Sequence, residues 1–154
     1  PNPVTASQPI FAGYPVKVSL QPQLTPQTKT FLSDSESRQK TTTIRNHEID
    51  LTDYALQCLV SEFGETISIF GPKDSSERGG VISFTFDGAH PHDISQVLDE
   101  DNICIRAGHH CAKPLMQVLN VGATSRVSMY LYNDQSDIDA LVAGLHKVRN
   151  LFIP

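Results

Sequence analysis

The sequence predicts an α+β domain, in which a small, mostly antiparallel sheet carries its helices packed on one face. Two observations indicate this class. Segments with helical periodicity alternate with short segments of strand periodicity, and the connections between them are shorter than the crossovers of a large parallel sheet. One such domain suits a chain of 154 residues, of which 39% are hydrophobic.

The composition of the chain changes near residue 44. Residues 1–43 are rich in Pro, Gln, Ser and Thr, and only residues 10–20 show a short strand-like alternation. A segment of this kind buries too little apolar surface to offset the entropy lost on ordering. We therefore expect residues 1–43 to form a poorly packed or disordered arm, and residues 44–154 to form the folded domain.

The first predicted helix covers residues 50–64, because apolar residues recur at every fourth position from Leu51. Asp50 or Thr52 could cap its start, and Gly64 could end it. Two strands follow, at residues 66–70 and 81–86, and the second alternates apolar with polar side chains.

The second half of the domain has the same mixed pattern. Pro91 or Asp93 opens the next predicted helix, and Ser136 with Asp139 resembles a capping box at the start of the last one. The predicted elements are, in order, a helix at residues 90–101, a strand at 103–106, a short helix at 112–122, a strand at 125–133 and a helix at 136–152.

Charge and cysteine content narrow the functional classes. The net charge of -5 argues against nucleic acid and anionic membranes as partners, and no apolar run approaches the roughly 20 residues that cross a bilayer. Three cysteines are too few, and odd in number, for a disulfide framework. We therefore expect a reducing compartment and a cytoplasmic location.

Cys111 stands in the segment "RAGHHCAKPLM", at the end of a predicted strand and among small or polar residues. Such a loop thiol is either a reactive group or a structural one, and the residues alone leave both interpretations open. Lys113, Arg106 and the start of the following helix would favour the thiolate. Cys58 and Cys104 lie in apolar segments, where a small core side chain is the simpler interpretation.

The histidines near these segments could suggest zinc, but their spacing argues against a metal site. His90 and His92 form one pair, while His109 and His110 directly precede Cys111, and the paired ligand spacing of zinc sites is absent. We expect no metal, and we expect His90 and His92 to hydrogen-bond backbone groups at a helix start.

Arg126 stands at the start of a half-buried strand. Most arginines in such a place are solvated or paired with a surface carboxylate, and that interpretation is the simpler one. A guanidinium that faces a cleft would instead bind a carboxylate with two hydrogen bonds.

Segment 106–116 resembles the cysteine-bearing loop of the SUF-type cysteine desulfurases, which include selenocysteine lyases and belong to the class V aminotransferase family. The similarity covers residues 44–153, through the segments "NHEIDLTDYAL", "IFGPKDSSERGGVISFTFDGAHPHDISQVLDEDNICIRAGHHCAKPLM", "ATSRVSMYLYN" and "IDALVAGLHKVRNLF". The resemblance implies the small C-terminal domain of a transferase that depends on pyridoxal 5'-phosphate.

The resemblance also implies a reaction. In this family the cofactor weakens the carbon–sulfur bond of L-cysteine, a protein thiolate takes the sulfur as a persulfide, and alanine leaves. Cys111 matches the persulfide-forming nucleophile, and Arg126 matches the arginine that holds the substrate carboxylate. In the family a loop carries and orients this thiol, and its positions correspond in this sequence to Arg106, Gly108, His109 and His110. The resemblance further implies that the protein forms a homodimer and passes sulfur to an acceptor protein. The sulfur would be used in iron–sulfur cluster assembly.

One part of the family pattern is absent from the sequence. Lys17, Lys29 and Lys40 lack the context of the cofactor-binding lysine, and the large domain that carries this lysine in the family has no counterpart here. We therefore expect the chain to be inactive alone. The alternative is a non-enzymatic sulfur-carrier or interaction module that uses the Cys111 thiol.

Overall fold

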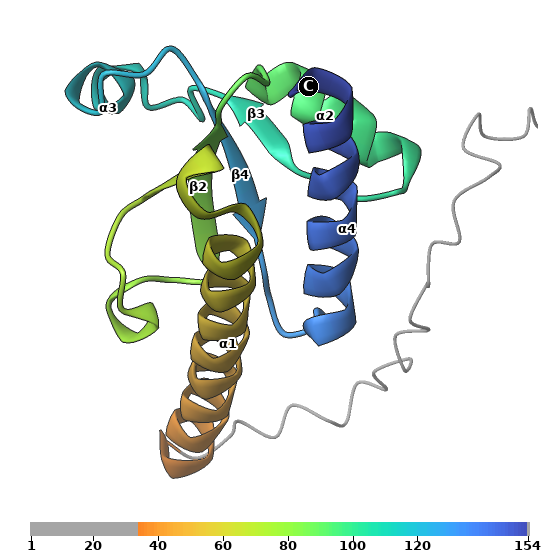
Figure 1. Ribbon diagram of the computed structural model, residues 1–154. Helices are drawn as coiled ribbons and strands as arrows, with labels where there is room; N and C mark the ends of the chain where they lie inside the picture. Colours follow the sequence, from red (N-terminus) through yellow and green to blue (C-terminus); the bar gives the residue numbers. More distant parts are fainter. Residues whose placement is uncertain (1–33, 154) are drawn as a thin grey trace, which may run out of the picture. The chain divides into compact units, whose positions relative to one another are not determined.

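The computed structural model describes residues 34–153, and residues 34–37 through their backbone alone. Helices and strands follow one another in the predicted order (Figure 1). The elements are α1 (Asp34–Phe63), β1 (Ile67–Phe70), β2 (Val81–Phe86), α2 (Pro91–Glu100), β3 (Arg106–Gly108), α3 (Lys113–Val118), β4 (Thr124–Ser128) and α4 (Gln135–Phe152), with short 3-10 turns at Gly64–Thr66 and Ser75–Glu77. Within this described part, no helix has the length and apolar character needed to cross a membrane.

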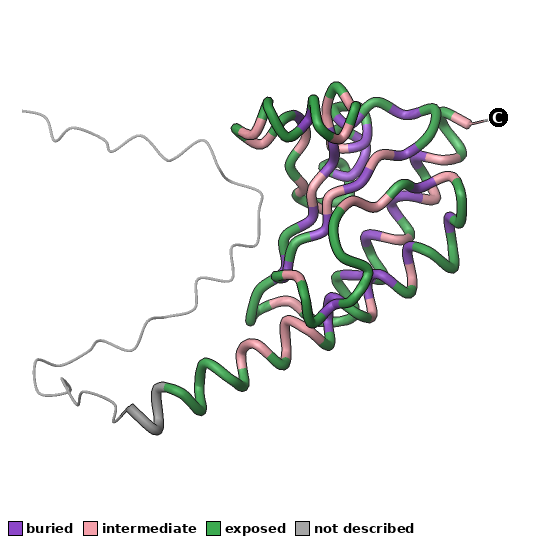
Figure 2. The backbone as a smooth tube through the Cα atoms, turned by 90° about the vertical axis from the view of Figure 1, so that its left-hand side faces the viewer, coloured by how far each residue is buried: buried purple, intermediate pink, exposed green. Residues whose placement is uncertain are grey.

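The four strands form one antiparallel sheet in the order β1-β2-β4-β3. The alternation in β2 buries Ile82, Phe84 and Phe86, and the intervening side chains point to the opposite face of the sheet. Figure 2 shows the burial of each residue along the backbone. Helices α1, α2 and α4 supply the rest of the core against the buried face. The predicted α+β class, with helices on one face of a small antiparallel sheet, is confirmed.

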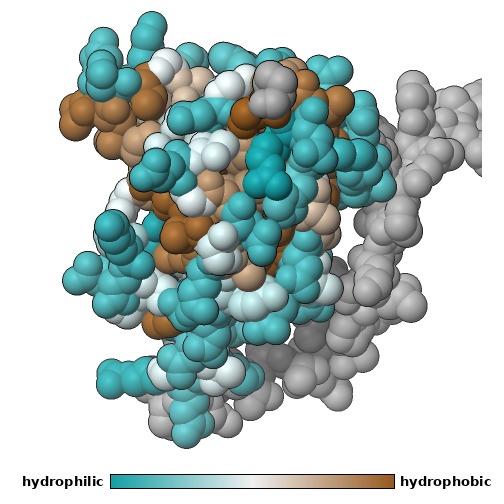
Figure 3. Space-filling model, in the orientation of Figure 1, coloured by the Kyte–Doolittle hydropathy of each residue, from teal (hydrophilic) through white to brown (hydrophobic). Residues whose placement is uncertain are grey.

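Helix α3 contributes little to this core. Met116 is its buried residue, whereas Leu115 and Val118 are 49% and 80% exposed. Figure 3 shows hydrophobic side chains gathered at the α3 end of the molecule. The segment that follows Cys111 therefore presents apolar surface to the solvent.

Helix α1 begins much earlier than the sequence pattern predicts. We expected a start at Asp50 or Thr52, but the helix begins at Asp34 and runs for 30 residues. Residues 38–43 are exposed, and Leu51 is the first buried residue, so the early turns have no apolar stripe that could predict them. Residues 34–43 are thus helical, and the rest of the predicted arm lies outside the described residues.

The end of α1 is as predicted. The helix stops at Phe63, and Gly64 follows with a φ of +51°. That left-handed conformation is easiest for glycine, which is why glycine so often follows the last residue of a helix.

Several further boundaries differ from the predictions: β4 ends at Ser128 and not at residue 133, and α3 ends at Val118 and not at residue 122. Helix α4 is capped by a reciprocal pair, Asp134 and Asp137, and not by Ser136 with Asp139. Strand β3 covers Arg106–Gly108 and not residues 103–106, because Ile103 N donates to Leu98 O at 3.0 Å and so belongs to the turn that ends α2.

Candidate functional site

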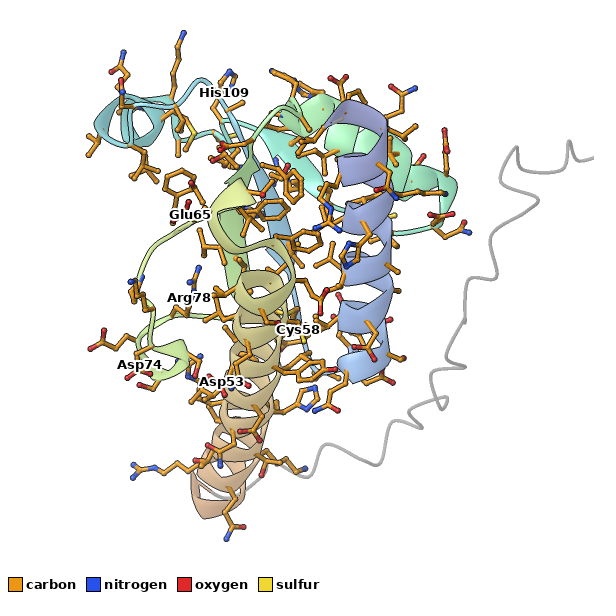
Figure 4. The ribbon with its side chains drawn as sticks, in the orientation of Figure 1. Asp53, Cys58, Glu65, Asp74, Arg78 and His109 are labelled. Carbon is orange, nitrogen blue, oxygen red and sulfur yellow. The ribbon has the colours of Figure 1, made fainter. Side chains whose placement is uncertain are left out.

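Cys111 lies on a tight turn that follows β3. The turn is closed by a hydrogen bond of 2.7 Å from Ala112 N to His109 O, and His109 is exposed at the α3 end of the molecule (Figure 4). Its two central residues, His110 and Cys111, have φ values of +53° and +60°. Left-handed backbone at residues other than glycine costs on the order of 1 kcal/mol or more each, so this turn needs support from its surroundings. The Cys111 thiol is exposed, as a reacting group requires.

His110 supplies that support by joining the turn to β4. Its Nε2 lies 3.1 Å from Thr124 O and 2.9 Å from Thr124 Oγ1. Burial lowers the pKa of His110 below its ordinary 6.5, and the positive charges of Arg126 and Arg106, with His109, lower it further against the effect of the Thr124 hydrogen bond. Together these effects favour the neutral imidazole form of His110.

Arg106 and Arg126 occupy directly opposite positions in the β3–β4 pair. Like charges in such positions repel each other, and neither guanidinium has an ion pair with a carboxylate in the described part of the chain. Arg126 is half-buried, and its Nε is buried without a hydrogen-bond partner among these residues. Arg126 is therefore neither fully solvated nor neutralised, and the pair forms a cationic patch that can bind an anionic group.

The structure brings most of the predicted site residues to one end of the sheet. Arg106 and Gly108 lie on β3, Arg126 lies opposite on β4, and His110 connects the turn that carries Cys111 to the same strand. These residues meet because β3 pairs with the first half of β4. The catalytic and binding roles assigned to them by resemblance stay predictions.

Thr124 is the site residue that the sequence analysis missed. It is completely buried, with 0% exposure, although it is polar. A threonine at the start of a strand of mixed polarity carries no signal by itself, and only the tertiary structure shows its hydrogen bond with His110.

Cys58, Cys104 and the pair His90 and His92 lie on other segments of the chain. Cys58 is half-buried against the core, whereas Cys104 is exposed, so the prediction of a core side chain at Cys104 is wrong. His90 caps α2 by accepting a hydrogen bond from His92 N at 3.3 Å, as predicted, and the two rings stack with centroids 5.3 Å apart. Over residues 34–153, no group of three or more His, Cys, Asp and Glu side chains is placed to hold a metal ion.

The described residues do not fit pyridoxal phosphate. A lysine that binds this cofactor covalently stands in a closed cavity, but the lysines of the described part are all exposed: Lys40, Lys73, Lys113 and Lys147. Lys147 is moreover paired with Asp101 at 2.7 Å. A cavity of about 500 Å³ beside α4 contains Asp101 and Asp137 in its wall and no lysine.

Comparison with known proteins identifies the family. The family model described as aminotransferase class-V matches residues 34–141. A probable cysteine desulfurase of Halalkalibacterium halodurans is 50% identical over 109 residues, which cover 71% of this chain and 26% of that protein. The chain thus spans about a quarter of the length of this relative.

Solved structures give the same result. The apo structure of a cysteine desulfurase from Thermococcus onnurineus superposes with a TM-score of 0.69 at 28% identity, over 77% of this chain and 29% of that one. The cysteine desulfurase CsdA of Escherichia coli, in an S-sulfonic acid form, superposes with a TM-score of 0.60 at 29% identity, over 70% and 27%. Sequence motifs, family match and fold agree, and the chain belongs to the class-V aminotransferase family.

Proposed function

We propose that this chain provides the sulfur-accepting thiol of a cysteine desulfurase. Cys111 would take sulfur from L-cysteine as a persulfide, with alanine as the other product. The observations that carry the proposal are the exposed Cys111 thiol, on a turn that His110 joins to β4, and two arginines of the β3–β4 pair that have no carboxylate partner among the described residues. The names of the relatives support it, although the chain covers only 26% of the first of them.

The proposed transfer balances without an added oxidant or reductant. The carbon–sulfur bond of the substrate breaks, a sulfur–sulfur bond forms at Cys111, and the carbon that lost sulfur gains a proton. The carbon is thereby reduced while the two sulfur atoms share the oxidation, so cysteine becomes alanine. The thiolate is the form of Cys111 that attacks.

The two arginines would orient the substrate and not react with it. A guanidinium binds a carboxylate through two parallel hydrogen bonds, and no carboxylate of the described residues occupies the guanidinium of Arg126. Arg106 adds a second positive charge from the opposite strand. Substrate bound there would lie on the polar face of the sheet, opposite the helices.

Pyridoxal phosphate is the cofactor that we propose for the complete reaction, where it would supply the electron withdrawal that loosens the carbon–sulfur bond. Because the described residues offer no enclosed lysine, a separate polypeptide segment would hold it. A homodimer, a cytoplasmic location and delivery of sulfur to an acceptor for iron–sulfur cluster assembly complete the proposal.

The test is sulfur uptake followed by mass spectrometry. The purified chain is incubated with a cysteine desulfurase lacking its own nucleophilic cysteine, together with pyridoxal phosphate and L-cysteine, and alanine release is measured in parallel. We expect one added sulfur atom on Cys111 and alanine in equal amount. Cys111→Ser should abolish both. Cys104→Ser is the matched control, since Cys104 is also an exposed thiol, and it should change neither.

A second candidate function follows from the absence of a cofactor site in the described residues: a non-enzymatic sulfur carrier. A carrier would accept sulfur on Cys111 from an intact desulfurase but would not restore alanine release to the cysteine-less enzyme. If Cys111 stays unmodified with both enzymes, neither function stands.

A further inference from the structure

We propose that Thr124 and His110 form a clasp that holds the Cys111 turn in its left-handed conformation, and that acid opens this clasp. The inference deepens the proposed function and rests on it, since it concerns how the sulfur-accepting thiol is presented. Thr124 and His110 act here as positioning residues and do not contact the substrate.

The hydrogen-bond geometry determines which nitrogen of His110 carries the proton. The main-chain oxygen of Thr124 can only accept, so the contact of 3.1 Å requires a hydrogen on Nε2. The same N–H also reaches Thr124 Oγ1 at 2.9 Å. In the neutral ring Nδ1 is then a bare acceptor, and this atom is buried without a hydrogen-bond partner in the described part of the chain.

The position of Thr124 makes it a firm anchor. It is the first residue of β4, it is the partner of Gly108 in the β3–β4 register, and it is completely buried. The turn begins one residue after Gly108 and must reverse direction through two residues with positive φ. His110 joins the middle of this turn to the strand beside it, so loss of the clasp leaves the left-handed backbone without its cross-strand bond.

Protonation of His110 works against the clasp. It would place a second N–H at the buried Nδ1 and a positive charge near Arg106 on β3, Arg126 on β4 and His109 in the turn. Burial, and after it these charges, lowers the pKa of His110 from its unfolded value of 6.5, although the hydrogen bond to Thr124 acts in the opposite direction. A lowered pKa means that the unfolded chain binds the proton more readily, so the clasp is at full strength above about pH 6.5 and weakens as the pH falls below it.

Hydrogen exchange of the Ala112 amide, which closes the turn, measures the clasp directly. Protection factors are read by NMR on the full chain at about pH 7.5 and about pH 5.5, with the amide of Phe84 in the sheet centre as an internal reference. We expect Thr124→Val, which keeps the shape and removes the hydroxyl, to lower Ala112 protection about fivefold. Thr124→Ser, which restores the hydroxyl, should recover most of it.

The replacement His110→Gln tests the acid response. Glutamine keeps a donor near the place of Nε2 but does not titrate. We therefore expect protection at Ala112 to be kept at the higher pH and no longer to fall at the lower pH, whereas the unsubstituted chain should lose it in acid. Imidazole nitrogen shifts of the unsubstituted chain should show the hydrogen on Nε2 and remain measurable even if a variant folds poorly.

Three results would overturn the clasp: a hydrogen on Nδ1, equal Ala112 protection in the Thr124→Val and unsubstituted chains, or an unsubstituted chain whose protection does not change with pH. None of these measurements involves sulfur. Failure of the clasp therefore leaves sulfur uptake on Cys111 intact, and failure of sulfur uptake leaves the exchange data unchanged, so the two proposals can be judged separately.

Discussion

Replacing Arg126 with methionine should stabilise the fold while removing the proposed substrate contact. Arg126 lies directly opposite Arg106, and like charges in that position cost roughly 0.2–1 kcal/mol. Its Nε is also buried without a partner among the described residues, a loss of about 1 kcal/mol or more. Methionine keeps an unbranched apolar chain and removes both penalties. Because Arg126 is still half-exposed, we expect the free energy of unfolding to rise by about 1 kcal/mol.

Urea unfolding followed by circular dichroism measures this change, which corresponds to about 4 °C in Tm for a domain of this size. Arg106→Met is the matched variant, since it removes the same repulsion from the exposed side of the pair. The repulsion can be removed only once, so the double variant should gain less than the sum of the two single variants. Additive effects, or a destabilised Arg126→Met, would refute the argument that the two charges strain the folded chain.

The same strain predicts a response to ligand. A carboxylate bound between the two guanidinium groups would relieve their repulsion, so millimolar L-alanine should raise the Tm of the unsubstituted chain and not that of Arg126→Met. An equal rise in both chains would indicate a site elsewhere on the molecule.

Three further predictions concern the scaffold. A Cβ at Gly144 would overlap Leu98 Cδ2, so Gly144→Ala should lower the free energy of unfolding by about 1–3 kcal/mol, whereas Gly79→Ala, which meets nothing within 4 Å, should change it little in urea unfolding. The hydrogen bond to Asp139, followed by that to Cys58, raises the pKa of Tyr54 to about 12, so Asp139→Asn should lower this pKa in a titration of phenolate absorbance. Asp134→Ala removes half of the capping box of α4 and should cost about 1 kcal/mol in thermal unfolding, an expectation that an unchanged Tm would contradict.

The sequence pattern predicted an element correctly where its buried side chains recur at regular spacing along the chain. The alternation in residues 81–86 predicted a strand, and its apolar positions, such as Ile82, are buried, because a side chain facing the core must recur with the period of its own backbone. The early turns of α1 could not be found in this way, since they bury nothing.

Other features escaped the sequence because they depend on caps and turns. Several residues before a helix can be suitable caps by type, and the backbone geometry decides which of them caps it. Asp134 caps α4, although Ser136 was equally suitable by residue type. Cys104 was expected in the core. It is exposed, because it lies in the connection between the turn that ends α2 and the start of β3.

By itself the sequence determined the class of the fold, the order of its elements and the loop that carries Cys111, because hydrophobic period and motif are properties of neighbouring residues. Only the tertiary structure decided that Arg106 faces Arg126 and that Thr124 receives His110. These pairs join residues 14 to 20 positions apart, and their meeting depends on the register between β3 and β4, which is set by the packing of the whole sheet.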